Sequence, residues 1–278
     1  MTERSAMPDR VIRAAGIALA IVVAYAVVVP MIAPVTWQEV SLGDARRGPS
    51  LLHWFGTDNA GRDLFVRVAL GLRVSLLIAV VCAVVSTVLG VLIGTIAAAA
   101  RGVTDGVLMR FTDATNALPH LLLGIVIVAF FPGNLLAIIA SISLTHWPQV
   151  ARIVRSVALT THSIEFVDAA YLAGASRWFV VARHLIPAAA GQASVALVLL
   201  LPHAIWHEST LSFLGLGLAP DRASLGTLLA ISRGEVLIGG WWTLAFPALA
   251  LVVTTLAVSG LAGALQRRVA PQSLARVA

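Results

Sequence analysis

Three ionisable residues, His203, His207 and Glu208, lie close together near the end of an apolar stretch. On a helix, the two histidines are four positions apart and share one face, where they could bind a metal ion. The order differs from the H-E-x-x-H of zinc proteases and no third ligand stands out, so a polar helix end is the preferred interpretation. Glu208, with the two histidines, remains a candidate gate or pathway residue, because ionisable groups within membrane segments are often functional.

No catalytic constellation accompanies these residues. The serines have no His and Asp grouping typical of hydrolases, and "GLG" at 215–217 is too short for a dinucleotide fingerprint. All 19 basic residues are arginine. A P-loop needs its lysine, and Schiff-base catalysis needs a lysine amine. The sequence therefore predicts a chain that is not an enzyme and holds no cofactor or metal. If ATP is used, another chain must hydrolyse it.

The composition predicts an integral membrane protein. Of the 278 residues, 59% are hydrophobic and 12% are charged, whereas soluble domains are about one quarter charged. Such a chain is expected to be all-α and surrounded by the lipid bilayer. The net charge of +6 is interpreted as arginine anchoring at cytoplasmic loops, and nucleic-acid binding is not expected.

Apolar runs of about 20 residues predict about six spanning helices in one transmembrane domain, 1–278. The spans are expected at about 14–35, 74–100, 114–131, 135–151, 185–206 and 240–264. The first run is interpreted as a retained span, because it is too long for a signal peptide and no A-x-A site follows. "PGN" at 132–134 predicts a tight turn. The apolar pieces "LSFLGLGLAP" and "LGTLLAIS" are too short to cross and are expected to be re-entrant or interfacial.

Arginine counts predict the orientation. With the N-terminus in the cytoplasm, twelve of the 19 arginines fall on the cytoplasmic side, in agreement with the positive-inside rule. Both termini would then be cytoplasmic. The extracytoplasmic segments would be 36–73 and 207–235, and a cytoplasmic loop would cover 152–184.

Two expected spans carry small residues at every fourth position, which lets helix backbones approach closely in lipid. The second span has Cys82, Ser86, Gly90, Gly94 and Ala98, and the sixth has Thr255, Ser259 and Gly263. Both rows are predicted to be tight interfaces with a neighbouring helix or subunit.

A polar stretch, EFVDAAYLAGASRWFVVARHLIP, interrupts the apolar chain at residues 165–187. Ser163 is expected to cap a helix that starts at Ile164, with Glu165 favourable in its first turn. Gly174 suits the left-handed position that ends such a helix. A second short helix is expected to follow it.

Both halves of this stretch have an apolar face at helical spacing. The face residues are Ile164, Val167 and Tyr171 in the first half and Trp178, Val181, Ala182 and Leu185 in the second. We expect a bent helical pair outside the bilayer, tied to the spans on either side, with the next span beginning at Pro187. A helix this short is marginal alone, so its apolar face needs either the membrane surface or a groove on a cytoplasmic protein.

"DAAYLAGASRWFVVARHLIP" resembles the EAA loop of permease subunits in ABC importers. In that pattern E-A-A is followed after three residues by G, and after nine more by I-x-L-P. Asp168, Ala169 and Ala170 match the first part, and Gly174 matches the glycine. The tail is matched by His184, Ile186 and Pro187. Asp168 replaces the usual Glu, and His184 stands where an apolar residue is expected.

Further segments are similar to the dipeptide, oligopeptide and nickel importer permeases. These are residues 53–80, "THWPQVARIVRS" and "ESTLSFLGLGLAPDRASLG". The short N-terminal region with one span before "FGTD" resembles the C-type member of the permease pair.

The resemblance implies the ABC importer type I permease fold in a bacterial plasma membrane. The chain would form half of a translocation pathway in a heterodimer with a homologous permease. Two cytoplasmic ATPase subunits or domains would hold ATP and Mg, and a substrate-binding protein would dock outside. The polar stretch would be the coupling helix that docks on the ATPase, through Glu165, Asp168, Ala169, Ala170, Gly174, Arg177 and Pro187. Short peptides are the expected substrates, and nickel chelates or glutathione are alternatives.

Two other classes remain as alternatives. One is a membrane channel or scaffold without energy coupling. The other is an ion-coupled carrier, which the near absence of carboxylates from the expected spans disfavours.

Overall fold

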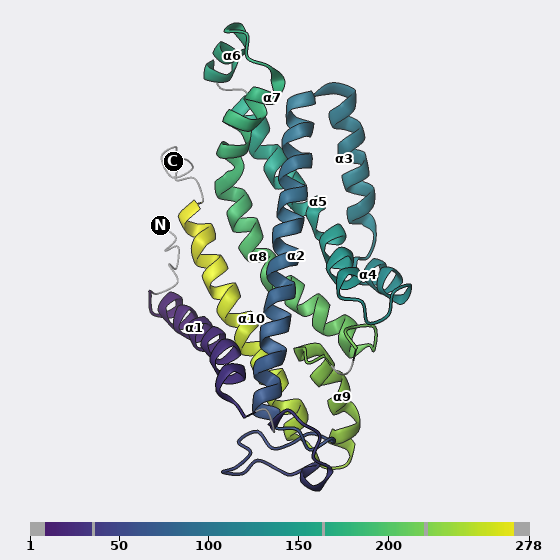
Figure 1. Cartoon of the computed structure of the whole chain (residues 1–278). Coiled ribbons are helices and arrows are strands. Elements are labelled where there is room, and N and C mark those ends of the chain that lie inside the picture. Colours follow the sequence, from purple (N-terminus) through teal and green to yellow (C-terminus); the bar gives the residue numbers. More distant parts are fainter. Residues whose placement is uncertain (1–8, 35–36, 163–164, 220–221, 270–278) are drawn as a thin grey trace, which may run out of the picture.

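The computed structural model describes residues 9–34, 37–162, 165–219 and 222–269, which form a long bundle of helices (Figure 1). The α-helices are α1 (Asp9–Ile32), α2 (Leu64–Ala100), α3 (Gly102–Ala117), α4 (His120–Ala129), α5 (Leu135–His162), α6 (Glu165–Leu172), α7 (Arg177–Val180), α8 (Ile186–Phe213), α9 (Leu225–Leu237) and α10 (Trp242–Val269). A π-helical turn, Val181–Leu185, joins α7 to α8. The all-helical expectation is confirmed for the described residues.

Four helices in the described residues are long and apolar enough to cross a membrane. They are Arg10–Ile32, Leu64–Ala100, Arg177–Phe213 and Trp242–Arg267. A fifth crossing arises if the bent pair α3 and α4 counts as one. Helix α5 has 28 residues but is less apolar, because Thr145, His146 and Gln149 interrupt it. About six spans were expected. The four helices, the bent pair counted as one span and α5 together account for that number.

The expected third span, 114–131, is divided in two. Helix α3 ends at Ala117, and α4 begins at His120 at an angle of 83° to it. Pro119 lies at the break, and Leu118 before it is extended (φ −74°, ψ 135°). A proline disfavours helical conformation in the residue before it, which explains the bend. The expected turn at 132–134 is confirmed, with Gly133 at φ +73°.

Three helices extend well beyond the expected spans, and one of them is α5, which ends at His162 and not at 151. Helix α2 begins at Leu64, ten residues before the expected 74, because the Asp63 carboxylate accepts a hydrogen bond from the Val66 amide and caps it. The helix expected over 185–206 runs continuously from Arg177 to Phe213. Parts of the segments expected to lie outside the membrane are therefore turns of long helices.

Helix α2 lies at the centre of the bundle and packs along α5 (Figure 1). A β-carbon added to Gly90 would lie 2.5 Å from Val150 Cβ, and one added to Gly94 would lie 2.5 Å from the Ala151 carbonyl oxygen. The predicted tight interface at the small residues of α2 is confirmed.

The second row of small residues does not form a tight interface with another helix among the described residues, and an interface with a neighbouring subunit stays a prediction. In α10, Ser259 is exposed and an added β-carbon at Gly263 meets only the end of the Arg267 side chain. The close approach is at Gly260 instead, where an added β-carbon would lie 2.9 Å from Ala15 Cβ of α1. Helix α1 packs on a different face of α10 from the one that the four-residue spacing indicated.

Gly94→Leu is expected to destabilise the bundle by about 1–3 kcal/mol, because the larger side chain must separate α2 from α5. The thermal midpoint of the detergent-solubilised protein measures the effect. Gly106→Leu in α3 is the matched control, since no atom lies within 4 Å of a β-carbon added there. Equal midpoints for the two variants would contradict the tight contact.

Candidate functional site

The polar stretch forms a helical elbow, which we define as residues 165–187, at one end of the bundle (Figure 1). Gly174 adopts φ +88°, which confirms the predicted left-handed conformation. The Ala175 amide donates to the Ala170 carbonyl and the Gly174 amide donates to the Tyr171 carbonyl, at 3.0 and 2.9 Å. These two bonds form a Schellman motif. Ser176 then caps α7 by accepting from the Phe179 amide.

The apolar face of α6 packs against the rest of the chain. Val167 is fully buried in a cluster with Ala98 of α2, Ala158 of α5 and Leu185. The expectation that this face needs a membrane or protein partner is therefore wrong for Val167, because the ends of α2 and α5 cover it. Ser163 and Ile164, the expected helix start, lie outside the described residues.

A different set of apolar side chains points outward from the elbow. Leu172, Trp178 and Phe179 are 91, 70 and 52% exposed. The elbow carries an open concavity of about 620 Å³, which is lined by Ala170, Gly174 and Phe179 among others. Exposed aromatic and aliphatic groups beside a hollow are typical of a protein contact surface.

The other predicted elbow residues are placed as follows. Ala169 and Arg177 are exposed, Ala170 is partly buried, and Pro187 is exposed on the first turn of α8. Glu165 and Asp168 lie in α6, and their side chains fall outside the described part of the chain. The backbone thus brings the predicted residues to one end of the molecule.

The second half of the elbow is not a separate helix. Residues 177–213 form one continuous helix, which includes the π turn before Pro187. Proline has no N–H to bond to the preceding turn, and its ring crowds the carbonyl four residues earlier. A wider π turn relieves this crowding without ending the helix. As a result, a single helix connects the elbow to Glu208, near the other end of the bundle.

Glu208 is fully buried, and the three serine hydroxyls bonded to it come from three elements. Its carboxylate accepts hydrogen bonds from Ser75 of α2 at 2.9 Å, Ser212 of α8 at 2.9 Å and Ser224 before α9 at 2.7 Å. A buried carboxylate requires such donors. Glu208 therefore joins α2, α8 and the start of α9, and its role as a gate or pathway residue stays a prediction.

The start of α9 orients this network. The Leu225 amide donates to Ser75 Oγ and the Thr227 amide donates to Ser224 Oγ, both at 3.1 Å. Each hydroxyl accepts one backbone amide and donates its own proton to the Glu208 carboxylate. Sequence reasoning missed these partners because Ser75 is 133 residues away. The position of Ser212 four residues after Glu208 was the only local signal.

Two further histidines, His146 and His120, lie near His203 and His207, although sequence analysis did not group them. The ring of His146 in α5 has its centroid 4.7 Å from that of His207, 6.5 Å from that of His203 and 5.3 Å from that of His120. His203 and His207 lie inside α8, not at a helix end as expected. In the described residues, no three His, Cys, Asp or Glu side chains are arranged to hold a metal ion.

The opposite end of the molecule carries an ordered polar loop, residues 37–63, packed beside the start of α2 (Figure 1). Asp58 accepts from Arg67 at 2.6 Å and from Arg62 at 2.9 Å, and Arg46 binds Glu235 of α9 at 2.9 Å. The Trp242 indole donates to the Thr57 carbonyl. The loop is thereby attached to α2, α9 and α10.

A bundle of long apolar helices with a protruding elbow at one end and a fixed polar loop at the other defines a multi-pass membrane subunit. The family described as "Binding-protein-dependent transport system inner membrane component" matches residues 90–271. The chain belongs to this family, the permease subunits of ABC importers. It is a multi-pass inner membrane protein, and it is the permease and not the ATPase of such a system. The expected family and fold class are confirmed.

Individual relatives are similar in sequence to this chain along most of its length. The oligopeptide transport system permease protein OppC of Salmonella typhimurium is 39% identical over 253 residues, which cover 90% of this chain and 83% of that protein. The dipeptide transport system permease protein DppC of Bacillus subtilis is 34% identical over 247 residues, covering 89% and 77%. The OppC of Bacillus subtilis is 35% identical over 238 residues, covering 86% and 78%. A permease of this family implies an ATPase and a binding protein as partners.

Proposed function

We propose that this chain is one of two homologous permease subunits of an importer that takes up short peptides. The similarity over 86–90% of the chain to proteins named as oligopeptide and dipeptide permeases supports this substrate class. The elbow supports the coupling role: it combines a fixed backbone, exposed apolar groups and an open concavity at the end of a long helix. Nickel chelates and glutathione are the alternative substrates, and nothing in the described residues favours them.

In the proposed mechanism the elbow is the surface on which a cytoplasmic ATPase docks, through Glu165, Asp168, Ala169, Ala170, Gly174, Arg177 and Pro187. This places both termini in the cytoplasm and the loop 37–63 outside, facing the binding protein. ATP and Mg bind to the ATPase subunits. When the ATPase subunits close, they move the elbow as a rigid body. The Schellman motif fixes the backbone of the elbow, and the buried Val167 packs it against α2 and α5.

The movement of the elbow would pass directly into the bundle. Helix α8 continues from the elbow to Glu208 without a break, and Glu208 is bonded to α2 and to the start of α9. A movement of the elbow would therefore reach these contacts through one continuous helix. This arrangement suits alternating access, in which packed elements switch between two discrete arrangements.

Uptake by the reconstituted complex tests the proposed function. Proteoliposomes with both permeases, the ATPases and the binding protein are expected to accumulate a labelled dipeptide or tripeptide only with ATP. Unlabelled peptide should compete, whereas glutathione and a nickel–histidine chelate should not. Uptake that persists without ATP would support a channel. Uptake abolished by a protonophore but not by ATP depletion would support an ion-coupled carrier.

A further inference from the structure

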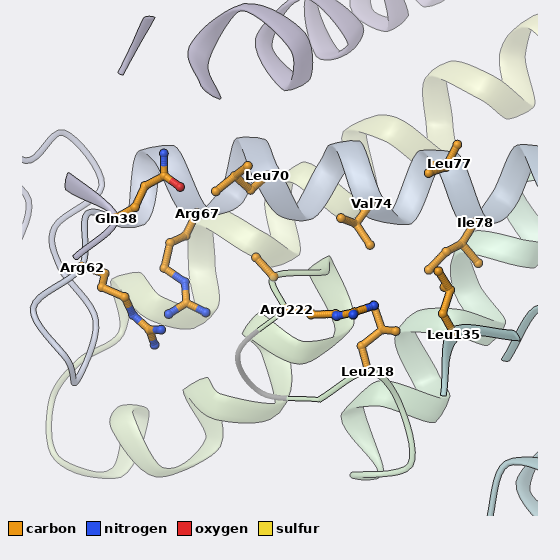
Figure 2. Close-up of a pocket in the computed structure, with 11 residues that line it drawn as sticks. Gln38, Arg62, Arg67, Leu70, Val74, Leu77, Ile78, Leu135, Leu218 and Arg222 are labelled. Atoms are coloured by element: carbon orange, nitrogen blue, oxygen red, sulfur yellow. The ribbon is translucent and has the colours of Figure 1, made fainter. Parts of the chain in front are cut away.

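A cavity of about 320 Å³ opens between the start of α2, the loop 37–63 and the segment that precedes α9 (Figure 2). Its floor is apolar and includes Val74, Ile78 and Leu218. Its mouth carries the side chains of Arg62, Arg67 and Arg222. The cavity lies at the lower end of the volume range of small-molecule sites, which is about 300–1,000 Å³.

The charge at this cavity is unbalanced. Three guanidinium groups line it, and no carboxylate is among the residues that line it in the described parts of the chain. Arg62 and Arg67 share one nearby carboxylate, that of Asp58. Among the described residues, three positive charges at the cavity are matched by one nearby carboxylate. Arg67 is only 3% exposed, so solvent screens this field less than at an open surface.

Arg222 is the guanidinium that is free to bind a ligand. Its side chain makes no hydrogen bond or ion pair with the described residues. Its backbone is nevertheless fixed, because its amide donates to the Ala219 carbonyl and its carbonyl accepts from Thr227 Oγ1 at 3.0 Å. Arg62 and Arg67 are held in place by Asp58 and supply a fixed positive field.

We propose that this cavity binds the carboxylate end of a small apolar ligand, with Arg222 donating to the carboxylate and the apolar floor covering the adjacent side chain. The planar guanidinium fits a carboxylate with two parallel hydrogen bonds. This inference rests on the proposed function, in which the ligand is the C-terminal residue of a short peptide. An ammonium group is excluded by the positive field, so the cavity takes the C-terminus and not the N-terminus of the peptide.

The first test compares an apolar dipeptide with its C-terminal amide. Binding to the purified permease–ATPase complex without the binding protein is measured by calorimetry, and uptake is measured with the binding protein. The wild type is expected to prefer the free carboxylate. Arg222→Gln is expected to reduce this preference about tenfold, the loss of one charge-assisted interaction. Arg222→Lys should restore part of it.

Two comparisons identify the source of any effect. Any preference of the binding protein itself cancels, since the same binding protein is used with wild type and variant. Arg47 is an exposed arginine of the loop 37–63 and does not line the cavity. Arg47→Gln should therefore leave the preference unchanged.

The results separate this inference from the proposed function. If the carboxylate preference in binding and uptake is the same in Arg222→Gln as in wild type, the cavity assignment is wrong. It is also wrong if Arg222→Gln weakens only the docking of the binding protein, because the cavity would then meet a carboxylate of that protein. If no peptide is taken up but Arg222-dependent binding of the carboxylate persists, the cavity assignment stands and the proposed function fails.

Discussion

Gly174→Trp is expected to abolish ATP-driven uptake while the permease still folds and inserts. At φ +88° no neighbouring atom lies within 4 Å of an added β-carbon, so bulk is not blocked by the fold. The strain of a non-glycine residue there is about 1–2 kcal/mol. The indole would instead fill the concavity that we assign to the ATPase contact. Uptake in proteoliposomes and co-purification of the ATPase are the measurements, and both should fall at least about tenfold by loss of well-packed contacts.

Gly174→Asn separates backbone strain from bulk. Asparagine tolerates the left-handed conformation and is small, so this variant should retain most of the uptake. The thermal midpoint of Gly174→Trp should fall only by the few degrees that a strain of about 1–2 kcal/mol gives, and that of Gly174→Asn by less, because Gly174 is not packed against the core. If Gly174→Trp transports normally and still binds its ATPase, the elbow is not the coupling surface.

Glu208→Ala is expected to lower the free energy of unfolding by about 2–4 kcal/mol and to abolish uptake. The substitution removes the acceptor of three buried hydroxyls, each of which costs about 1–3 kcal/mol if it is left unpaired. It also removes the bond between Ser224 and Glu208 that joins the start of α9 to α8, while the Leu225 amide still donates to Ser75 of α2. The thermal midpoint of the solubilised protein and uptake in proteoliposomes measure the two effects.

Glu208→Gln should be intermediate. The amide keeps the shape and one acceptor oxygen, but its NH₂ group replaces an oxygen that accepts from Ser75 or from Ser212 and Ser224, and it cannot accept those hydroxyl protons. Thr210→Ala is the control, since Thr210 lies on the same helix and bonds only to the Trp206 carbonyl. A stable and active Glu208→Ala protein would show that the serine network does not hold α9.

The elbow was the part of the site most accessible from the sequence. A Schellman motif uses residues within six positions of one another, so the position of Gly174 could be predicted from local spacing alone. The tight packing of α2 was likewise visible in its row of small residues, because a four-residue spacing follows directly from the helix period. For α10 the same rule did not identify the face that meets α1, because that face depends on the packing of other helices.

The amino-acid sequence by itself determined an all-helical membrane chain with a broken polar helix between two apolar runs. It did so because hydropathy, helix period and glycine conformation are local properties of the chain. Only the tertiary structure decided that Val167 faces inward, that α8 runs unbroken from the elbow to Glu208, and that Ser75 and Ser224 converge on that carboxylate. These features join residues up to 133 positions apart, and packing of helices around α2 brings them together.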